Sequence, residues 1–282
     1  MDFRSASAGR GLAWFQGAVR MLDKNPRGLL AVTLFFVLIQ QIPNLLSTVA
    51  PMLSYALLGV LLLLSPALLA GLLHAIGEAD AGRPVSPGQL FEGLRRPGVR
   101  AQLLVLGVLQ VLALLLVVLA AQRIFGADNL AILMKVAEQK IAPDSAEVQQ
   151  IAAPLLKTMM VAVVILFVLL SGMFFAIPRV LFDGRSALGA FGESIVACAA
   201  NVLALTVYGL MLIGVVLVVC VALMIVAAIF ALFGKVGAVL LLVIVIAVSV
   251  VGVLVNTAGN YLAWREVFGH ADQDSAQAGI VV

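Results

Sequence analysis

Long apolar blocks alternate with short stretches that carry nearly all the charge. Six blocks have the roughly 20 residues that a helix needs to cross a hydrocarbon core of about 30 Å. They predict spans at 28–49, 52–76, 101–121, 155–177, 201–230 and 237–262. Strands of a β-barrel would alternate in polarity, and runs such as VLLLLSPALLA do not. The pattern therefore predicts an all-α membrane protein with about six transmembrane helices.

The connections between the blocks differ in length. The first two spans and the last two are joined by short connections, so each pair should form an antiparallel hairpin. The segment 123–154 is long, and its apolar residues recur at helical spacing. We expect an external amphipathic helix there, broken by Pro143, with Asp144 or Ser145 capping a second helix. This loop either lies on the outer membrane surface or caps the bundle.

Three segments share an order that suggests an internal repeat. At 15–25, 91–101 and 191–201, a phenylalanine begins about ten residues of mixed character that lead into a span. The unit would be an interfacial helix followed by a helical hairpin, and chance similarity among apolar segments fits equally well. We assign 1–270 to one membrane domain and 271–282 to a flexible cytoplasmic tail.

Composition and charge agree with this interpretation. Hydrophobic residues make up 63% of the chain and charged residues 11%, against roughly 25% charged in soluble domains. The net charge of +3 does not indicate a nucleic-acid partner, because the basic residues flank the spans. With the N-terminus inside, twelve of the 17 lysines and arginines are cytoplasmic. This bias predicts a bacterial inner-membrane protein with both termini in the cytoplasm.

Two stretches have glycine, proline and aromatic residues around the spans: SPALLAGLLHAIGEADAGRPVSPGQLFEGLRRP at 65–97 and FAIPRVLFDGRSALGAFGESIVACAANVLALTVYGL at 175–210. They resemble a group of uncharacterised bacterial integral membrane proteins, and the resemblance extends from Trp14 to Trp264. The group is loosely similar to the membrane domain of some glycerophosphoryl diester phosphodiesterases. The resemblance implies a multi-pass inner-membrane protein with no assigned reaction. No soluble stretch is long enough for the catalytic domain of those enzymes, so none of their catalytic residues carries over.

The spans contain almost no ionisable residues, apart from His74 near the end of the second. His74 and Glu78 could place two metal ligands on one helix face. No second His or Cys cluster joins them, so a hydrogen-bonded interfacial histidine is the favoured interpretation. An intramembrane carboxylate, typical of ion-coupled transporters, is missing from the spans. Motifs for phosphate, dinucleotide or zinc sites are also missing, so we expect no cofactor, metal or catalytic residue.

Uncharged polar residues within the spans have two interpretations. They could line a polar cavity, or they could form interhelical hydrogen bonds worth about 0.6–2 kcal/mol each. We favour hydrogen bonding, with Gln110 or the segment 41–44 as partner of the last two asparagines. The candidates are Gln40, Gln41, Asn44, Gln110, Asn256 and Asn260.

Two further sets of residues suggest packing and lipid contact. Small residues that recur every four positions in the second span predict a helix-packing face, with a substrate groove as the alternative. A basic cluster after that span should attract anionic lipid head groups at about 1 kcal/mol per charge. The first set is Ala67, Gly71, Ala75 and Ala79, and the second is Arg83, Arg95, Arg96 and Arg100.

We therefore expect a non-enzymatic protein that acts through helix, lipid or partner-protein interactions. Its partners would be membrane lipids and either a membrane protein or a second copy of the chain. The alternative is a carrier or channel for a lipid-like or small neutral solute. A hydrated cavity reaching Gln110, Asn256 and Asn260 would favour transport, whereas a packed centre would favour the first interpretation.

Overall fold

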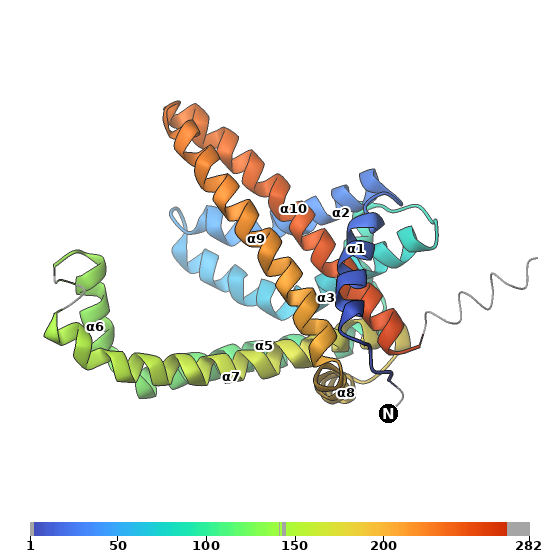
Figure 1. Ribbon diagram of the computed structural model, residues 1–282, viewed down its shortest axis with the longest axis horizontal. Coiled ribbons are helices and arrows are strands. Elements are labelled where there is room, and N and C mark those ends of the chain that lie inside the picture. Colours follow the sequence, from blue (N-terminus) through green and yellow to red (C-terminus); the bar gives the residue numbers. More distant parts are fainter. Residues whose placement is uncertain (1–2, 141, 143–144, 270–282) are drawn as a thin grey trace, which may run out of the picture.

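The computed structural model describes residues 3–140, 142 and 145–269, and the regular structure in these ranges is entirely helical (Figure 1). Pro143, Asp144 and the tail 271–282, on which sequence predictions fall, lie outside the described residues. The α-helices are α1 (Gly9–Met21), α2 (Pro26–Leu46), α3 (Pro51–Asp80), α4 (Glu92–Arg95), α5 (Pro97–Ile124), α6 (Gly126–Ala137), α7 (Ala146–Asp183), α8 (Ala187–Ala200), α9 (Val202–Ala231) and α10 (Gly234–Val267), and the 3₁₀ helix η1 (Pro87–Phe91) precedes α4.

Six helices are long and apolar enough to cross a membrane, which confirms the predicted class. They are α2, α3, α5, α7, α9 and α10. Helices α3, α5 and α10 extend a few residues beyond the predicted spans, and α7 extends well beyond its own. The 38 residues of α7 rise by about 57 Å at 1.5 Å per residue, nearly twice the roughly 30 Å of a hydrocarbon core. Such a helix must tilt within the membrane or continue beyond it.

The connection between α5 and α7 departs from the prediction in one respect. Helix α6 is the expected amphipathic helix, and it lies at the far end of the α5–α7 hairpin, away from the other hairpins (Figure 1). The expected second helix is not separate. Ser145 caps α7 itself, its Oγ accepting a hydrogen bond from Val148 N at 3.4 Å, and α7 continues through Pro154. Membrane-spanning helices tolerate an internal proline, so the segment after Ser145 and the fourth span form one helix.

A short helical segment precedes each of three long hairpins. Helix α1 leads into α2 and α3, η1 and α4 lead into α5 and α7, and α8 leads into α9 and α10. This is the order of the repeat considered above. The hairpins diverge from one end of the molecule (Figure 1). We call that end, formed by α1, η1, α4, α8 and the adjoining ends of α3, α7 and α10, the basal end.

At two of the prolines inside the long helices, polar side chains bond to the carbonyl groups that the prolines leave without a donor. Pro178 has no N–H to donate to the carbonyl of Phe174, and Asn260 Nδ2 donates to that oxygen at 2.7 Å. Pro66 leaves the Leu62 carbonyl in the same position, and Ser65 Oγ lies 2.9 Å from it. An unsatisfied carbonyl in hydrocarbon costs several kcal/mol, roughly. The polar groups near these prolines therefore stabilise the helices that contain them.

Helix α7 also receives a side chain into its backbone from α8. Ser194 Oγ accepts a hydrogen bond from Phe175 N at 2.9 Å and donates one to the Ser171 carbonyl at 2.6 Å. In a regular helix those two backbone groups would pair with each other. Insertion of a side chain into the helical ladder is a recognised cause of bending. The segment 171–178 is thus shaped by contacts from outside its own helix.

The stripe of small residues on α3 is buried, and its glycine packs against η1. Ala67, Ala75 and Ala79 are at most 2% exposed. A Cβ atom on Gly71 would lie only 1.9 Å from the Leu90 carbonyl oxygen of η1. Glycine is therefore required there by a close backbone approach. The neighbour of Gly71 is the short 3₁₀ helix rather than another span.

The hydrophobic core is concentrated at the basal end. Ile76 of α3, Phe175 of α7 and Ala263 of α10 are fully buried there. In contrast, none of the apolar window of α9 is buried, and only 17% of that of α10. Because lipid is as apolar as these side chains, the exposed parts of the hairpins suit contact with lipid or with another membrane protein.

Candidate functional site

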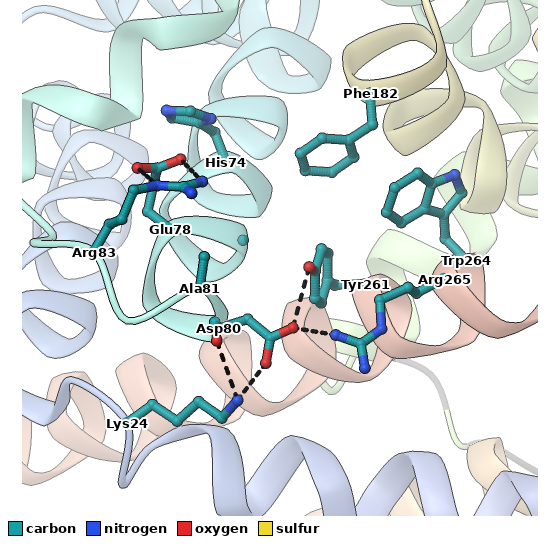
Figure 2. Close-up of a pocket in the computed structure, with 11 residues that line it drawn as sticks. Lys24, His74, Glu78, Asp80, Ala81, Arg83, Phe182, Tyr261, Trp264 and Arg265 are labelled. Carbon is teal, nitrogen blue, oxygen red and sulfur yellow. Dashed lines mark hydrogen bonds and ion pairs between the residues drawn. The ribbon is translucent and has the colours of Figure 1, made fainter. Parts of the chain in front are cut away.

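A carboxylate at the basal end joins three parts of the chain (Figure 2). Asp80 is the last residue of α3, and its Oδ2 accepts hydrogen bonds from Arg265 and, at 3.3 Å, from the Tyr261 hydroxyl of α10. Lys24, between α1 and α2, binds Oδ1 and donates to the Asp80 carbonyl at 3.3 Å. The first and third hairpins are thereby linked through one side chain.

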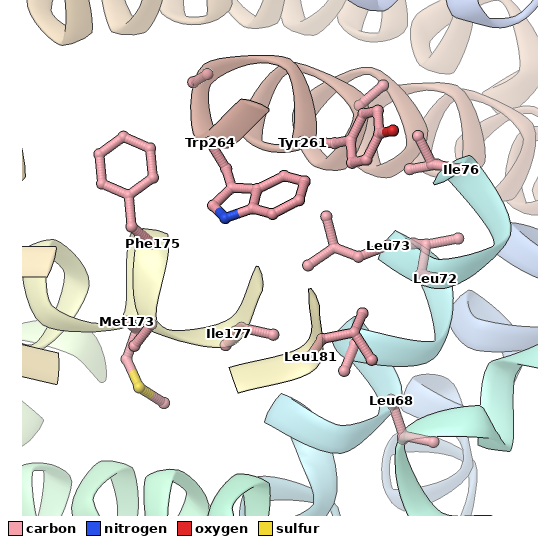
Figure 3. Close-up of a cluster of buried hydrophobic side chains, with 14 of the residues drawn as sticks. Leu68, Leu72, Leu73, Ile76, Met173, Phe175, Ile177, Leu181, Tyr261 and Trp264 are labelled. Carbon is pink, nitrogen blue, oxygen red and sulfur yellow. The ribbon is translucent and has the colours of Figure 1, made fainter. Parts of the chain in front are cut away.

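These residues border an open pocket of about 560 Å³. One wall is aromatic: the Phe182 and Trp264 rings stack with centroids 4.6 Å apart, and Tyr261 lies 5.8 Å from Trp264. Tyr261 and Trp264 also belong to the buried cluster that α10 forms with α3 and α7 (Figure 3). The full lining is Lys24, His74, Gly77, Glu78, Asp80, Ala81, Arg83, Phe182, Tyr261, Trp264 and Arg265.

His74 and Glu78 both face this pocket, on the side opposite the aromatic wall (Figure 2). Arg83 Nε and Nη2 each lie 2.6 Å from a different oxygen of Glu78, a bidentate pair. These hydrogen bonds raise the pKa of the Arg83 guanidinium above its ordinary value. The half-buried His74 ring makes no hydrogen bond to any residue that the structure describes. The expectation of a hydrogen-bonded histidine at the membrane interface therefore stays a prediction.

A second group of charges joins α7 to α8. The Arg179 side chain is 9% exposed and lies 2.6 Å from Asp183 and 2.5 Å from Glu193. Its guanidinium also sits 4.3 Å from the centre of the Phe268 ring. Trp264 Nε1 donates to Asp183 at 3.3 Å. A buried cation with two carboxylates and an aromatic face is fully partnered, so this group suits a structural role.

Helix α1 is held against α10 by a third ion pair. Arg10 makes two hydrogen bonds to the Glu266 carboxylate, at 2.6 and 2.5 Å, and Trp14 Nε1 adds one at 2.9 Å. The hydrogen bond to Glu266 raises the pKa of the Arg10 guanidinium. The aromatic and charged residues of α1 therefore fix it to the last span.

The uncharged polar candidates are not brought together. Gln110 Oε1 accepts from Ser65 at 3.3 Å, whereas Asn260 bonds to a backbone carbonyl of α7. The Asn256 side chain is exposed. No hydrogen bond within 3–140, 142 and 145–269 links Gln110, Asn256 and Asn260, so the expected partners are wrong. Asn260 bonds instead to the Phe174 carbonyl, which has no backbone donor because residue 178 is a proline.

The remaining polar candidates lie near the turn between α2 and α3. Gln40 is half-buried, and Gln41 and Asn44 are exposed. Asn44 Nδ2 donates to Gln41 Oε1 at 3.0 Å, within the same helix. These three residues lie at the end of the hairpin opposite the basal pocket (Figure 1).

The basic cluster divides between pocket and surface. Arg83 lines the pocket, and Arg96 pairs with Glu92 at 3.0 Å. Arg95 and Arg100 are exposed. The four arginines are therefore not equivalent, and only one of them faces the pocket.

Two apolar pockets flank the third hairpin. One of about 850 Å³ lies between α1, α9 and α10 and includes Phe15 and Cys220. The other, of about 440 Å³, lies between α7, α8, α9 and α10 and includes Phe174 and Cys198. Asn256 borders both pockets. Their walls suit hydrocarbon much better than a hydrated solute.

Sequence reasoning missed most of the basal pocket. Lys24 and Arg265 lie just outside predicted spans and were counted only among the basic residues that set the orientation, and Asp80 was not considered. A usable signal was present: acidic residues at the ends of otherwise apolar helices need cationic partners. The sequence offered no means of telling which cation meets which carboxylate.

Comparisons with known proteins agree with the membrane architecture. A protein of Burkholderia thailandensis named "Probable inner membrane protein" is 29% identical over 215 residues, which is 75% of each chain. No solved structure matches the chain. A family model described as "Domain of unknown function (DUF7847)" matches residues 12–266, from within α1 to near the end of α10. The protein is thus a multi-pass membrane protein that belongs to the DUF7847 family.

Proposed function

We propose that this protein acts in the bacterial inner membrane without catalysing a reaction, through contacts with lipids and with a membrane-protein partner or a second copy of itself. The name of the Burkholderia relative supports the inner membrane as its location. The charge bias supports cytoplasmic termini and a cytoplasmic basal end. The likeness to membrane domains of glycerophosphoryl diester phosphodiesterases stays a prediction.

The observation that carries this proposal is that polar side chains within the spans bond to backbone groups of the helices. Asn260 and Ser65 bond to carbonyl groups left free by prolines, and Ser194 bonds to backbone groups of α7. Asn260 and Ser194 join α7 to α10 and α8, and Ser65 completes the backbone of its own helix, so these three groups serve the packing of the helices. The large apolar surface of α9 and α10 then favours lipid or protein as the contacting species.

The test is extraction of the full chain with its surrounding membrane into polymer-bounded nanodiscs, followed by mass spectrometry of lipids and proteins. We expect a defined lipid set enriched over the bulk membrane, or a partner or second copy in fixed proportion. The alternative predicts flux of a lipid analogue or neutral solute in proteoliposomes, lost in a folded Asn256→Leu variant. The proposal would be contradicted if flux were observed and lost in the Asn256→Leu variant while the extracted protein was a monomer with no enriched lipid and no partner.

A further inference from the structure

We propose that the basal pocket binds a phosphate group, carried by a phospholipid head or by a soluble organic phosphate. This inference rests on the proposed function, since it specifies where and how the protein would contact lipid. The residues that carry it are Lys24, Arg83 and His74, which line the pocket together with the aromatic wall (Figure 2).

The charge balance of the pocket favours an anion. Lys24, Arg83 and Arg265 face two carboxylates, Glu78 and Asp80, which leaves one positive charge in excess with His74 neutral. All four carboxylate oxygens already accept hydrogen bonds from those cations and from Tyr261. The acidic groups therefore act as counter-charges that position the basic side chains.

Hydrogen-bond donors remain available in the same pocket. An ammonium has three N–H groups, and Lys24 directs its hydrogen bonds only to two oxygens of Asp80 among the described residues. Arg83 uses Nε and Nη2 for Glu78, so three of its five N–H groups remain. The His74 ring adds a donor without a partner among the residues described. A phosphate oxygen accepts strongly from all three kinds of donor.

The position of the pocket suits a head group at the membrane surface. From residue 52 to 77, α3 carries no Asp, Glu, Lys or Arg, and Glu78 and Asp80 follow in its last turn. The hydrocarbon boundary must therefore fall close to the pocket. Tyr261 and Trp264 are residue types enriched at that boundary. The volume of about 560 Å³ lies within the roughly 300–1,000 Å³ typical of small-molecule sites.

The experiment measures binding to the purified full chain in alkyl maltoside detergent, which carries no phosphate, with and without added phosphatidylglycerol. Native mass spectrometry counts bound lipid, and thermal unfolding gives the accompanying stabilisation. Parallel samples receive glycerol 3-phosphate or inorganic phosphate. Stabilisation by phosphatidylglycerol alone assigns the site to a lipid head, and stabilisation by glycerol 3-phosphate assigns it to a soluble phosphate. Either result supports the proposal, whereas no response to any of the probes would overturn it.

Three variants make the test specific to the pocket. Arg83→Gln should weaken binding about fivefold, the effect of roughly one interfacial charge. Glu78→Gln should strengthen binding, because it removes a negative charge and frees the Arg83 guanidinium. Arg100→Gln is the matched control, since Arg100 is an exposed arginine of the same cluster that does not line the pocket.

The outcomes separate this inference from the proposed function. Equal losses in Arg83→Gln and Arg100→Gln, or weaker binding in Glu78→Gln, would overturn the pocket as the site and leave general lipid contact intact. Absence of any enriched lipid or partner in native nanodiscs would instead contradict the proposed function. Because Arg83 is exposed, its variant should fold, and Glu78→Gln provides an effect of opposite sign.

Discussion

The contact between Asn260 and the Phe174 carbonyl allows the role of a polar residue within a span to be measured directly. Replacing Asn260 with Leu removes the donor 2.7 Å from a carbonyl whose helical partner position is occupied by Pro178. Interhelical hydrogen bonds in membranes contribute about 0.6–1.7 kcal/mol. The variant should therefore lose about 1 kcal/mol of unfolding free energy. Asn256→Leu, one turn away and exposed, should change it by less than about 0.5 kcal/mol.

A double-mutant cycle identifies the cause. In a Pro178→Ala background the backbone N–H of residue 178 can donate to Phe174, so Asn260→Leu should cost little there. Unfolding free energies would be measured in bicelles by steric trapping, with insertion checked for each variant. An equal cost of Asn260→Leu in both backgrounds would refute the assignment of Asn260 to the proline break. A comparable loss in Asn256→Leu would show that any asparagine in α10 serves the same purpose.

Three further predictions follow from the packing and the topology. Gly71→Ala should lower the melting temperature in detergent markedly, because the added Cβ would lie 1.9 Å from a backbone oxygen of η1. Gly214→Ala is the control and should be neutral, because a Cβ there would meet no atom within 4 Å. Ser194→Ala should cost about 1–3 kcal/mol in unfolding free energy. Ser249→Ala should cost almost nothing, because the Ser249 hydroxyl bonds only to its own helix. Equal losses in the two variants would contradict the insertion of Ser194 into α7. A reporter fused to the carboxyl terminus should be cytoplasmic and one inserted beside Ser145 external, and swapped results would reverse the orientation.

The span pattern could be predicted from sequence because hydrocarbon imposes a single requirement on each helix. Blocks of about 20 apolar residues have few alternatives in a membrane. The stripe containing Gly71 was also visible, since small residues at spacing four mark a close approach. The segment that packs against Gly71 could not be predicted, because η1 is short and has no periodicity of its own. Helix ends such as those of α7 were underestimated, because polar helical turns outside hydrocarbon carry no hydropathy signal.

The candidate site was less accessible to sequence reasoning. Asn260 was singled out as a polar group needing a partner, but its partner is a backbone atom, which has no signature in the sequence. The consequence of Pro178 for the Phe174 carbonyl is local and could have been inferred. Pairing it with Asn260, 86 residues later, requires the fold. The same holds for Asp80 and Arg265, which meet only because the ends of α3 and α10 converge.

The way in which α7 is completed by later residues bears on how the protein is made. Ser194 lies 19 residues beyond Phe175, and Asn260 lies 86 residues beyond Phe174. When α7 first leaves the ribosome, neither side chain has entered the membrane beside it. Its backbone reaches its final form only after α8 and then α10 have been synthesised and inserted. The second hairpin therefore reaches its final structure only after the third has been inserted. A ribosome stalled before residue 260 would leave the Phe174 carbonyl without a hydrogen-bond donor in the bilayer.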